Sequence, residues 1–145
     1  MRIVVLSDTH DHLPDHLISA FAGADEIWHL GDVCRPSTLA GLLALGPPVR
    51  VVHGNCDSPE DWPLTLSFTL EGQRIHLEHI PSRHPPSDCD LFLHGHTHVP
   101  RDETLGGVRF LNPGCITRPN RGAPASYAWL TLHEGQEPMW KIVRI

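Results

Sequence analysis

The chain contains 145 residues, of which 40% are hydrophobic, and carries a formal net charge of −6 with histidine neutral. This length is typical of one domain with a normal buried core, so we expect a single domain over residues 1–145. No apolar run is long enough to span a membrane, and the absence of a lysine or arginine block argues against a protein that binds duplex nucleic acid.

The first half of the chain alternates short apolar runs with segments of helical spacing. The apolar runs predict buried strands over residues 2–6, 26–30 and 49–53. The segments between them predict two helices, one from Pro14 to Gly23 and one over residues 36–45. This alternation is typical of a parallel α/β sheet, in which the carboxyl ends of the strands share one edge and gather ligands there.

The second half is interpreted as mainly antiparallel. Turn residues at 71–73, 106–107 and 134–136 indicate hairpins. The strands predicted around these turns, together with one short buried strand, cover residues 67–70, 74–79, 91–93, 104–111, 126–132 and 139–145. Residues 80–90 are rich in proline, serine and aspartate, which favours a loop over a helix.

Every predicted strand end of the central part is followed by a side chain that can hold a metal ion. These residues are Asp8 and His10, Asp32, Asn55, His79, and His96 and His98. His94, His96 and His98 alternate, so in an extended chain they would share one face. Neutral imidazole suits Zn, Mn, Fe, Ni or Co, and the 12 histidines are the one excess in the composition. The strand ends therefore predict a transition-metal site.

The same motifs, in this order, resemble the calcineurin-like metallophosphoesterases. The matching forms are Asp8-x-His10, Gly31-Asp32, Gly54-Asn55, His79 and Gly95-His96-x-His98. The short forms Ser-Asp-Thr-His, Gly-Asn-Cys-Asp, Gly-His-Thr-His and Asn-Pro-Gly resemble the small bacterial and archaeal phosphodiesterase branch, which Vps29-like scaffolds also resemble. The resemblance implies an α/β fold, namely a four-layer α-β-β-α sandwich of two mixed β-sheets flanked by helices.

The resemblance also implies two divalent metal ions, with Mn as our first choice and Fe, Zn, Ni or Co compatible. The first ion would be held by Asp8, His10, Asp32 and His98. The second would be held by Asp32, Asn55, His79 and His96, so that Asp32 bridges the two. A water or hydroxide between the ions would then attack phosphorus in line, with no covalent intermediate.

Two positions depart from the pattern of the family. Ile80 stands where a glycine usually follows the motif histidine, and His76 is a nearby competitor for the role expected of His79. Cys56 stands where many larger members carry a histidine that acts as general acid. Without that acid, activated substrates or diesters are favoured.

Further residues near these motifs are candidates for catalysis or substrate binding. His12 could serve as a substitute acid or a substrate contact, and Asn55 is expected to contact substrate besides binding metal. We group Cys56 and Asp57 with them as catalytic candidates, although Asp57 is better interpreted as a turn or supporting residue. His94 is interpreted with equal weight as a substrate-facing residue and as a packed, hydrogen-bonded histidine.

The leading hypothesis is a metal-dependent phosphodiesterase that acts on a small phosphate ester. The alternatives are a non-catalytic, protein-binding scaffold of the Vps29 type and a phosphomonoesterase or nuclease of the same superfamily. The short loop at 80–90 predicts an open cleft. The four cysteines include no C-x-x-C pair, which favours a reducing cytoplasm. Exposed strands in a chain of this size make a homodimer reasonable.

Overall fold

The computed structural model describes residues 1–145. The first half contains β1 (Arg2–Leu6), α1 (Asp15–Ala20), β2 (Glu26–His29), the 3₁₀ helix η1 (Pro36–Leu39), α2 (Ala40–Ala44) and β3 (Val49–Val51). The second half contains β4 (Thr65–Leu70), β5 (Gln73–Glu78), β6 (Leu91–Leu93), β7 (Arg101–Leu105), β8 (Val108–Asn112), β9 (Ser126–Thr131) and β10 (Met139–Arg144). None of the helices is long and apolar enough to cross a membrane.

The strands form two mixed, five-stranded sheets. The strand order is β10-β9-β1-β2-β3 in one sheet, called the β1 sheet, and β4-β5-β6-β8-β7 in the other, called the β6 sheet. β1, β2 and β3 are parallel to one another, and so are β5, β6 and β8, while the remaining pairs are antiparallel. The predicted sandwich of two mixed sheets is therefore confirmed.

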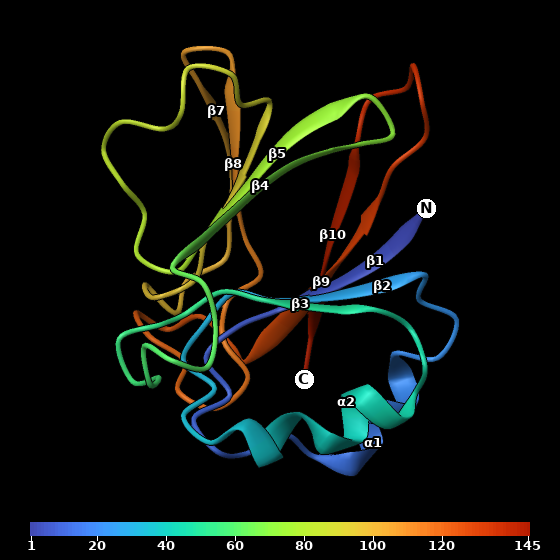
Figure 1. The fold of residues 1–145 in the computed structure, drawn as a ribbon, viewed down its shortest axis with the longest axis vertical. Coiled ribbons are helices and arrows are strands. Elements are labelled where there is room, and N and C mark those ends of the chain that lie inside the picture. The colour runs from blue at the N-terminus through green and yellow to red at the C-terminus, as the bar shows by residue number, and fades with distance from the viewer.

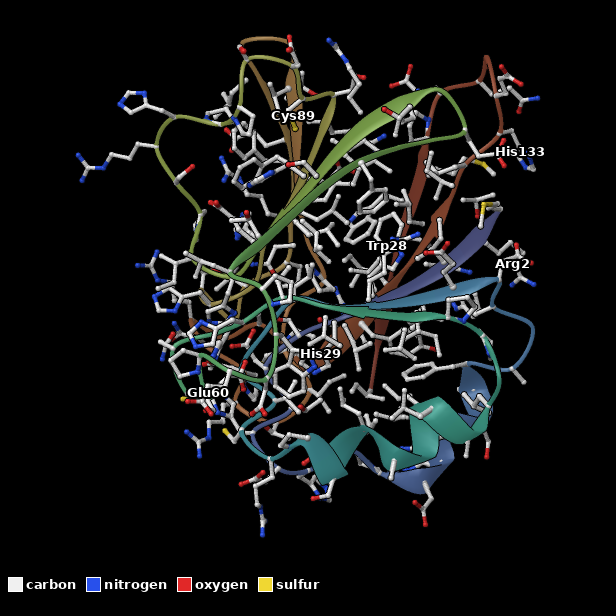
Figure 2. All side chains as sticks on the ribbon, in the orientation of Figure 1. Arg2, Trp28, His29, Glu60, Cys89 and His133 are labelled. Carbon is white, nitrogen blue, oxygen red and sulfur yellow. The ribbon has the colours of Figure 1, made fainter.

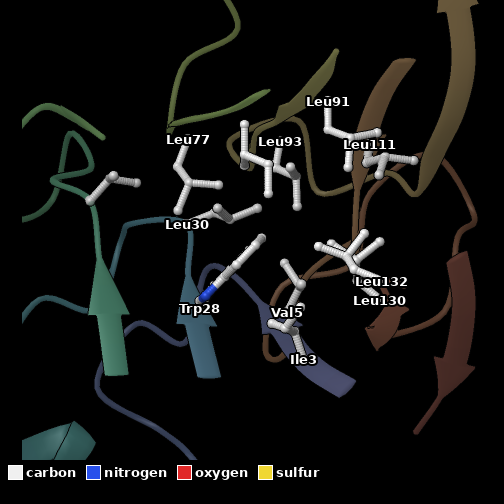
Figure 3. Close-up of a cluster of buried hydrophobic side chains, with 12 residues drawn as sticks. Ile3, Val5, Trp28, Leu30, Leu77, Leu91, Leu93, Leu111, Leu130 and Leu132 are labelled. Atoms are coloured by element: carbon white, nitrogen blue, oxygen red, sulfur yellow. The ribbon is translucent and has the colours of Figure 1, made fainter. Parts of the chain in front are cut away.

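A shared hydrophobic core fills the space between the two sheets (Figure 3). Ile3 and Val5 of β1 and Trp28 of β2 meet Leu77 of β5 and Leu93 of β6 in one cluster. Successive residues of a strand point to opposite faces, which is why alternate positions of β1 and β2 enter this cluster. Figure 2 shows Trp28 between the sheets and the next residue, His29, on the other side of β2.

Helices cover the outer face of the β1 sheet only (Figure 1). The other alternate residues of β1, Val4 and Leu6, pack with Leu17 of α1 and Leu42 of α2 in a second core cluster. The outer helical layer expected on the β6 sheet is absent, since every helix lies between residues 15 and 44. The physical reason lies in residues 80–90, where three prolines prevent a helix and the chain runs as the predicted loop.

Several element boundaries differ from the sequence prediction, and two of the differences have a clear physical reason. The helix expected over residues 36–45 divides into η1 and α2, because Pro36 and the weak helix formers Ser37 and Thr38 occupy its first turn. β7 begins at Arg101 and not near residue 104, with a run of charged residues that is not typical of a strand. Such residues are tolerated there because β7 is an edge strand.

Candidate metal centre

The loops that follow β1, β2, β3, β5 and β6 gather at one end of the sandwich, on the left of Figure 1. Parallel pairing within each sheet sends these loops to the same edge. Backbone hydrogen bonds join them directly: Asp8 N–H donates to the Gly31 carbonyl at 3.0 Å, and Gly95 N–H donates to the His79 carbonyl at 3.1 Å. Residues from five separate stretches of sequence are thereby brought together.

The backbone of these loops is held in a conformation that side chains ordinarily avoid. Non-glycine residues with positive φ concentrate here, namely Asp8, His10, Asp11, Asp32, Cys34, His96 and His98. Each such residue costs on the order of 1–3 kcal/mol, and strain of this kind persists where surrounding structure imposes it, most often at functional sites. The strained positions include five of the predicted ligands.

Glycines of the three motifs allow the loops to approach one another. A Cβ on Gly54 would lie 2.2 Å from the Asp32 nitrogen, and a Cβ on Gly95 would lie 2.1 Å from Ser7 Oγ. A Cβ on Gly31 would lie 2.9 Å from the backbone of Gly54. No other residue fits these positions without moving the backbone that carries the candidate ligands.

The first group of converging donors consists of Asp8, His10 and His98, whose ligand atoms lie within 4.8 Å of one another. His98 Nε2 is 2.9 Å from Asp8 Oδ1. His10 Nε2 is 3.9 Å from the same oxygen and 3.7 Å from Asp32 Oδ2. The Asp8 side chain is fully buried, the His10 side chain is nearly so, and the His98 side chain is 19% exposed.

The second group centres on His79, whose Nε2 lies 3.4 Å from Asp32 Oδ1 and 4.0 Å from Asp8 Oδ1. Asn55 Oδ1 lies 3.1 Å from His79 Nε2 and 3.0 Å from His96 Nδ1. The two oxygens of Asp32 thus face different groups, Oδ1 towards His79 and Oδ2 towards His10. This is the arrangement that a bridging carboxylate requires.

In His79 and His98, a hydrogen bond made by Nδ1 leaves Nε2, the ring nitrogen that faces the carboxylates, free to bind a cation. His79 Nδ1 donates to the Leu30 carbonyl at 2.7 Å, and His98 Nδ1 donates to the Arg118 carbonyl. In the neutral tautomers that these bonds select, Nε2 of each ring carries a lone pair directed at a carboxylate. Only a proton or a metal ion between them makes that approach favourable.

Two buried atoms of the first group provide separate evidence for a bound cation. Asp8 Oδ1 and His10 Nε2 are buried without a hydrogen-bond partner. A buried polar atom left unpaired costs about 1–3 kcal/mol, so native proteins rarely keep one without a reason such as a bound ion. The mixed oxygen and nitrogen donors fit a divalent transition metal.

The titration behaviour of the group agrees with a site built for positive charge. The Asp8 carboxylate raises the pKa of His98 above its usual value. Burial lowers the pKa of His79, but the hydrogen bond to Asp32 and the charge of Asp8 outweigh burial, and the net shift is upward. Burial also raises the pKa of Asp32, yet hydrogen bonds from His79 and from the Cys56 N–H hold it well below its usual value.

Asp57 proves to be a positioning residue that links two of the loops. Its carboxylate is 8% exposed and accepts three backbone N–H bonds: Asp32 N at 2.9 Å, Gly54 N at 2.7 Å and Cys34 N at 2.7 Å. Its oxygens are therefore engaged by backbone and do not face the metal candidates. The predicted interpretation of Asp57 as a supporting residue fits this geometry better than a catalytic one.

Two other supporting residues belong to motifs of the sequence, but the motifs alone did not indicate this role. Ser7 Oγ donates to Asp8 Oδ2. Asn112, fully buried, donates from Nδ2 to the Gly95 carbonyl at 2.9 Å and accepts the Gly114 N–H at 2.8 Å. Asn112 thereby holds the loop that carries His96, which explains why an Asn-Pro-Gly motif accompanies the ligand motifs.

Two other predicted residues lie outside the cluster. His12 is exposed and lines a separate cavity with Pro14 and Ile116, so the structure does not bring it to the other candidates. His76 is hydrogen-bonded to Ser67 at 2.7 Å and faces away, which leaves His79 at the position expected for the ligand.

The side chain of Cys56 lies beside the two groups, and its sulfur forms a third set of converging donors with His10 and Cys34, all within 4.8 Å of one another. Its N–H donates to Asp32 Oδ1 at 2.8 Å, and Asn55 Nδ2 donates to its sulfur at 3.7 Å. Local desolvation and the nearby Asp32 carboxylate raise the pKa of the Cys56 thiol to about 12. A protonated thiol is a poor nucleophile, which agrees with a mechanism that needs no covalent intermediate.

Of the two interpretations of His94, substrate-facing or packed, the structure supports the packed one. The residue is 1% exposed, its Nδ1 donates to the Gly95 carbonyl at 3.0 Å, and its Nε2 lies 3.4 Å from Arg101 Nη1. It is a packed and fully hydrogen-bonded histidine. His94 also belongs to the lining of a surface cavity, together with Arg101 and His96.

Comparison with known proteins places these observations in a family. The model of the calcineurin-like phosphoesterase superfamily domain matches residues 1–135. Phosphodiesterase YfcE of Escherichia coli (strain K12) is 33% identical over 160 residues, which covers 90% of this chain and 87% of YfcE. The solved structure of YfcE, a phosphoesterase from E. coli, aligns with a TM-score of 0.79 at 28% identity and covers 100% of both chains.

The fold is shared more widely than the sequence. Wild-type Vps29 from Entamoeba histolytica, solved in complex with Zn²⁺, aligns with a TM-score of 0.79 at 21% identity and covers 99% of each chain. At this identity the similarity supports the fold alone.

Proposed function

Because the chain belongs to the calcineurin-like phosphoesterase superfamily, we propose that it is a phosphodiesterase that uses two divalent metal ions. The observation that carries the proposal is the converging donor set around the buried Asp8, Asp32 and His79, in which Asp8 Oδ1 faces His98 Nε2 at 2.9 Å and receives no hydrogen bond. A fold kept only for binding partners would have no need to preserve such a costly arrangement.

The two ions would be held by overlapping sets of residues. Asp8, His10, Asp32 and His98 would hold one, and Asp32, Asn55, His79 and His96 would hold the other. When bound, the ions polarise the phosphoryl oxygens and supply a nucleophile from water at neutral pH. Mn is our first choice of metal, and Fe, Zn, Ni and Co remain compatible with these donors.

The chain's own residues bind and orient the ester around this centre. Asp8 and Asp32 provide only two negative charges, so a dimetal centre retains positive charge that attracts a phosphate diester. Asn55 extends from an exposed loop position beside His79 and His96, where its amide can contact a phosphoryl oxygen. Although burial raises the pKa of Asp32, hydrogen bonds from His79 and from the Cys56 N–H hold it well below its usual value, so this carboxylate stays ionised.

Substrate preference follows from what stands next to the cluster. The position after Asn55 holds Cys56, whose thiol is a weak acid, and the exposed His12 lies in a separate cavity. No strong proton donor therefore stands beside a leaving group. Esters whose leaving group departs without protonation, such as aryl diesters, should react fastest. The cleft is open on the side of Ile80, which is 54% exposed, so small esters of varied shape should enter.

The test is hydrolysis of bis(4-nitrophenyl) phosphate by protein loaded with Mn²⁺. We expect turnover that a chelator removes and that Mn²⁺ restores. Asp32→Asn should lower kcat/KM by on the order of 100-fold or more, because it removes a charge from both metal groups. Asp61→Asn, an exposed aspartate outside the cluster, serves as the matched control and should match the wild type.

The same assay separates the competing functions. Faster turnover of 4-nitrophenyl phosphate than of the diester would favour a monoesterase, and cleavage of single-stranded DNA at a comparable rate would favour a nuclease. Protein that binds Mn²⁺ in calorimetry yet hydrolyses none of these substrates would overturn the proposal and favour a scaffold.

A further inference from the structure

A polar cavity of about 540 Å³ adjoins the candidate metal centre on the side of His96. Its lining consists of Pro81, His94, His96, Thr97, Val99, Pro100, Arg101, Asn120 and Arg121. Because His96 belongs both to this lining and to the predicted ligand set, a molecule whose phosphorus sits at the metal centre has this cavity immediately beside it. Two guanidinium groups in the lining make it suited to an anion.

One of these cations, Arg101, is held in place from several directions. Its guanidinium stacks over the Phe110 ring at 4.5 Å, and Nη1 lies 3.4 Å from the His94 ring. Nη2 and Nε donate to Glu103 at 2.8 and 3.0 Å, so most of its charge is already compensated. Arg101 is therefore a rigid wall of the cavity and only a weak source of net charge.

The second cation, Arg121, comes from a loop that is tied to the metal centre. Within residues 116–123, Thr117 Oγ1 donates to the Asp8 carbonyl at 3.1 Å. Asn120 Nδ2 donates to the Thr97 carbonyl at 3.2 Å, and the Arg118 carbonyl accepts from the His98 ring. These bonds fix the backbone of the loop against the two ligand motifs, so the exposed side chain of Arg121 starts from a defined position beside the cavity.

Arg121 has no acidic partner. Ion pairs engage Arg35, Arg50, Arg74, Arg101 and Arg109, whereas the other arginines, Arg121 among them, form none. Arg121 is the unpaired arginine in the lining of this cavity, in a chain whose net charge is −6. An exposed guanidinium at a polar cavity can form bidentate hydrogen bonds to a carboxylate or a phosphate.

A different cavity adjoins the centre on the side of His79. This second cavity, of about 360 Å³, is lined by Asn55 and His79 together with the exposed side chains of Leu64 and Ile80. It contains no arginine or lysine. The two arms of a diester held at the centre would therefore meet unlike surroundings, one cationic and one largely apolar.

We propose that the cavity lined by Arg101 and Arg121 binds a second anionic group, a carboxylate or phosphate, on the non-leaving arm of the substrate. Arg121 is the specificity-determining residue, and Arg101 with His94 shapes the wall against which the anion sits. The inference deepens the proposed diesterase function and rests on it for the placement of the reacting phosphate.

The experiment compares two aryl diesters with the same leaving group, 4-nitrophenyl 2-carboxyethyl phosphate and 4-nitrophenyl propyl phosphate. With Mn²⁺-loaded wild type, we expect a higher kcat/KM for the carboxylated ester. Arg121→Gln should lower kcat/KM for that ester by about 10-fold or more, mainly through KM, because a charge-assisted hydrogen bond is lost. The propyl ester should change by less than about twofold.

Lys141→Gln controls for net charge, since it also removes one positive charge from an exposed side chain, on β10 and outside the cavity. It should leave both esters unaffected. Equal effects of Arg121→Gln on the two esters, or no wild-type preference for the carboxylated one, would overturn the subsite and leave the proposed function intact.

A binding measurement keeps the two proposals separable. Calorimetry gives the Kd of 2-carboxyethyl phosphate and of propyl phosphate for the wild type and for Arg121→Gln, with no hydrolysis required. If neither diester were hydrolysed, the proposed function would fall. Tighter binding of the carboxylated phosphate that disappears in Arg121→Gln would still support the subsite, whereas equal affinities would exclude it.

Discussion

At the scale of single residues, Asp57 orients the loops of the candidate metal centre although its own carboxylate does not face the metal candidates. Asp57 receives backbone N–H groups from the loop after β2 and from the loop after β3, at 2.7–2.9 Å. Those loops carry Asp32 and Asn55. Since a metal site depends on the residues that orient its ligands, Asp57 should matter for metal affinity as much as for stability.

We therefore expect Asp57→Ala to reduce the free energy of unfolding by about 3–5 kcal/mol, because three buried N–H groups lose a charged acceptor. Bound Mn²⁺ should fall in parallel. Urea denaturation and metal analysis measure the two effects. Asp57→Asn, which keeps one acceptor oxygen, should give an intermediate loss, and the exposed Asp61→Ala should give none. An Asp57→Ala variant with wild-type stability would contradict the role assigned to these bonds.

Which residues could be predicted from sequence depends on how each acts. Asp8, Asp32 and His96 are proposed to act through their own side chains at strand ends, and an ordered set of such endings is visible in the chain. Asp57 and Arg121 act through contacts with backbone or cavity that only the assembled loops create. The pattern around them indicates a turn, and nothing in it indicates what the turn packs against.

At the scale of elements, the close approach of loops from neighbouring strands decides whether the centre forms. Gly54 follows β3, and the Cβ it lacks would lie 2.2 Å from the Asp32 nitrogen and 2.3 Å from Asp32 Oδ1. Gly41 of α2 lacks a Cβ that would lie 2.3 Å from Ile18 Cδ1, the flexible end of a side chain on α1. A methyl group at Gly54 would therefore meet rigid backbone, whereas a methyl group at Gly41 would meet a side chain that can move.

Gly54→Ala should reduce stability by about 1–3 kcal/mol and abolish tight Mn²⁺ binding, because backbone that carries a ligand must move. Gly41→Ala should stay within about 1 kcal/mol of the wild type, since the alanine favours the helix while Ile18 adjusts its rotamer. Thermal unfolding with and without Mn²⁺ measures both variants. A Gly54→Ala protein whose Tm still rises with Mn²⁺ as in the wild type would show that the loops tolerate the methyl group.

Elements of regular pattern and their hairpin pairings were predictable, whereas the parallel pairing of β5, β6 and β8 was not. The apolar runs of β1, β2 and β6 identify buried strands because both faces of each strand are covered. β7 escaped detection in its first half because an edge strand needs no apolar face. The missing helical layer follows from the prolines of residues 80–90, which were correctly interpreted as a loop.

At the scale of the whole molecule, one core joins the two sheets that together supply the centre. The central cluster takes Ile3 and Val5 from the β1 sheet and Leu77, Leu93 and Leu111 from the β6 sheet, all at most 2% exposed. Asp8 and Asp32 follow strands of the first sheet, and His79 and His96 follow strands of the second. The relative position of the ligand sets is therefore fixed by packing between the sheets, and we propose that residues 1–145 unfold as one cooperative unit.

Leu93→Ala tests this coupling, because Leu93 is fully buried between the sheets and directly precedes the segment that carries His96 and His98. The cavity should cost about 2–5 kcal/mol of unfolding free energy. Far-UV circular dichroism and tryptophan fluorescence should still report coincident urea transitions, since Trp28 lies in the same core. Leu105→Ala, at a position 48% exposed on β7, should cost less than about 0.5 kcal/mol. Two separated transitions, with fluorescence preceding dichroism, would mean that the sheets unfold independently and that the metal centre spans two units held together only by its ligands.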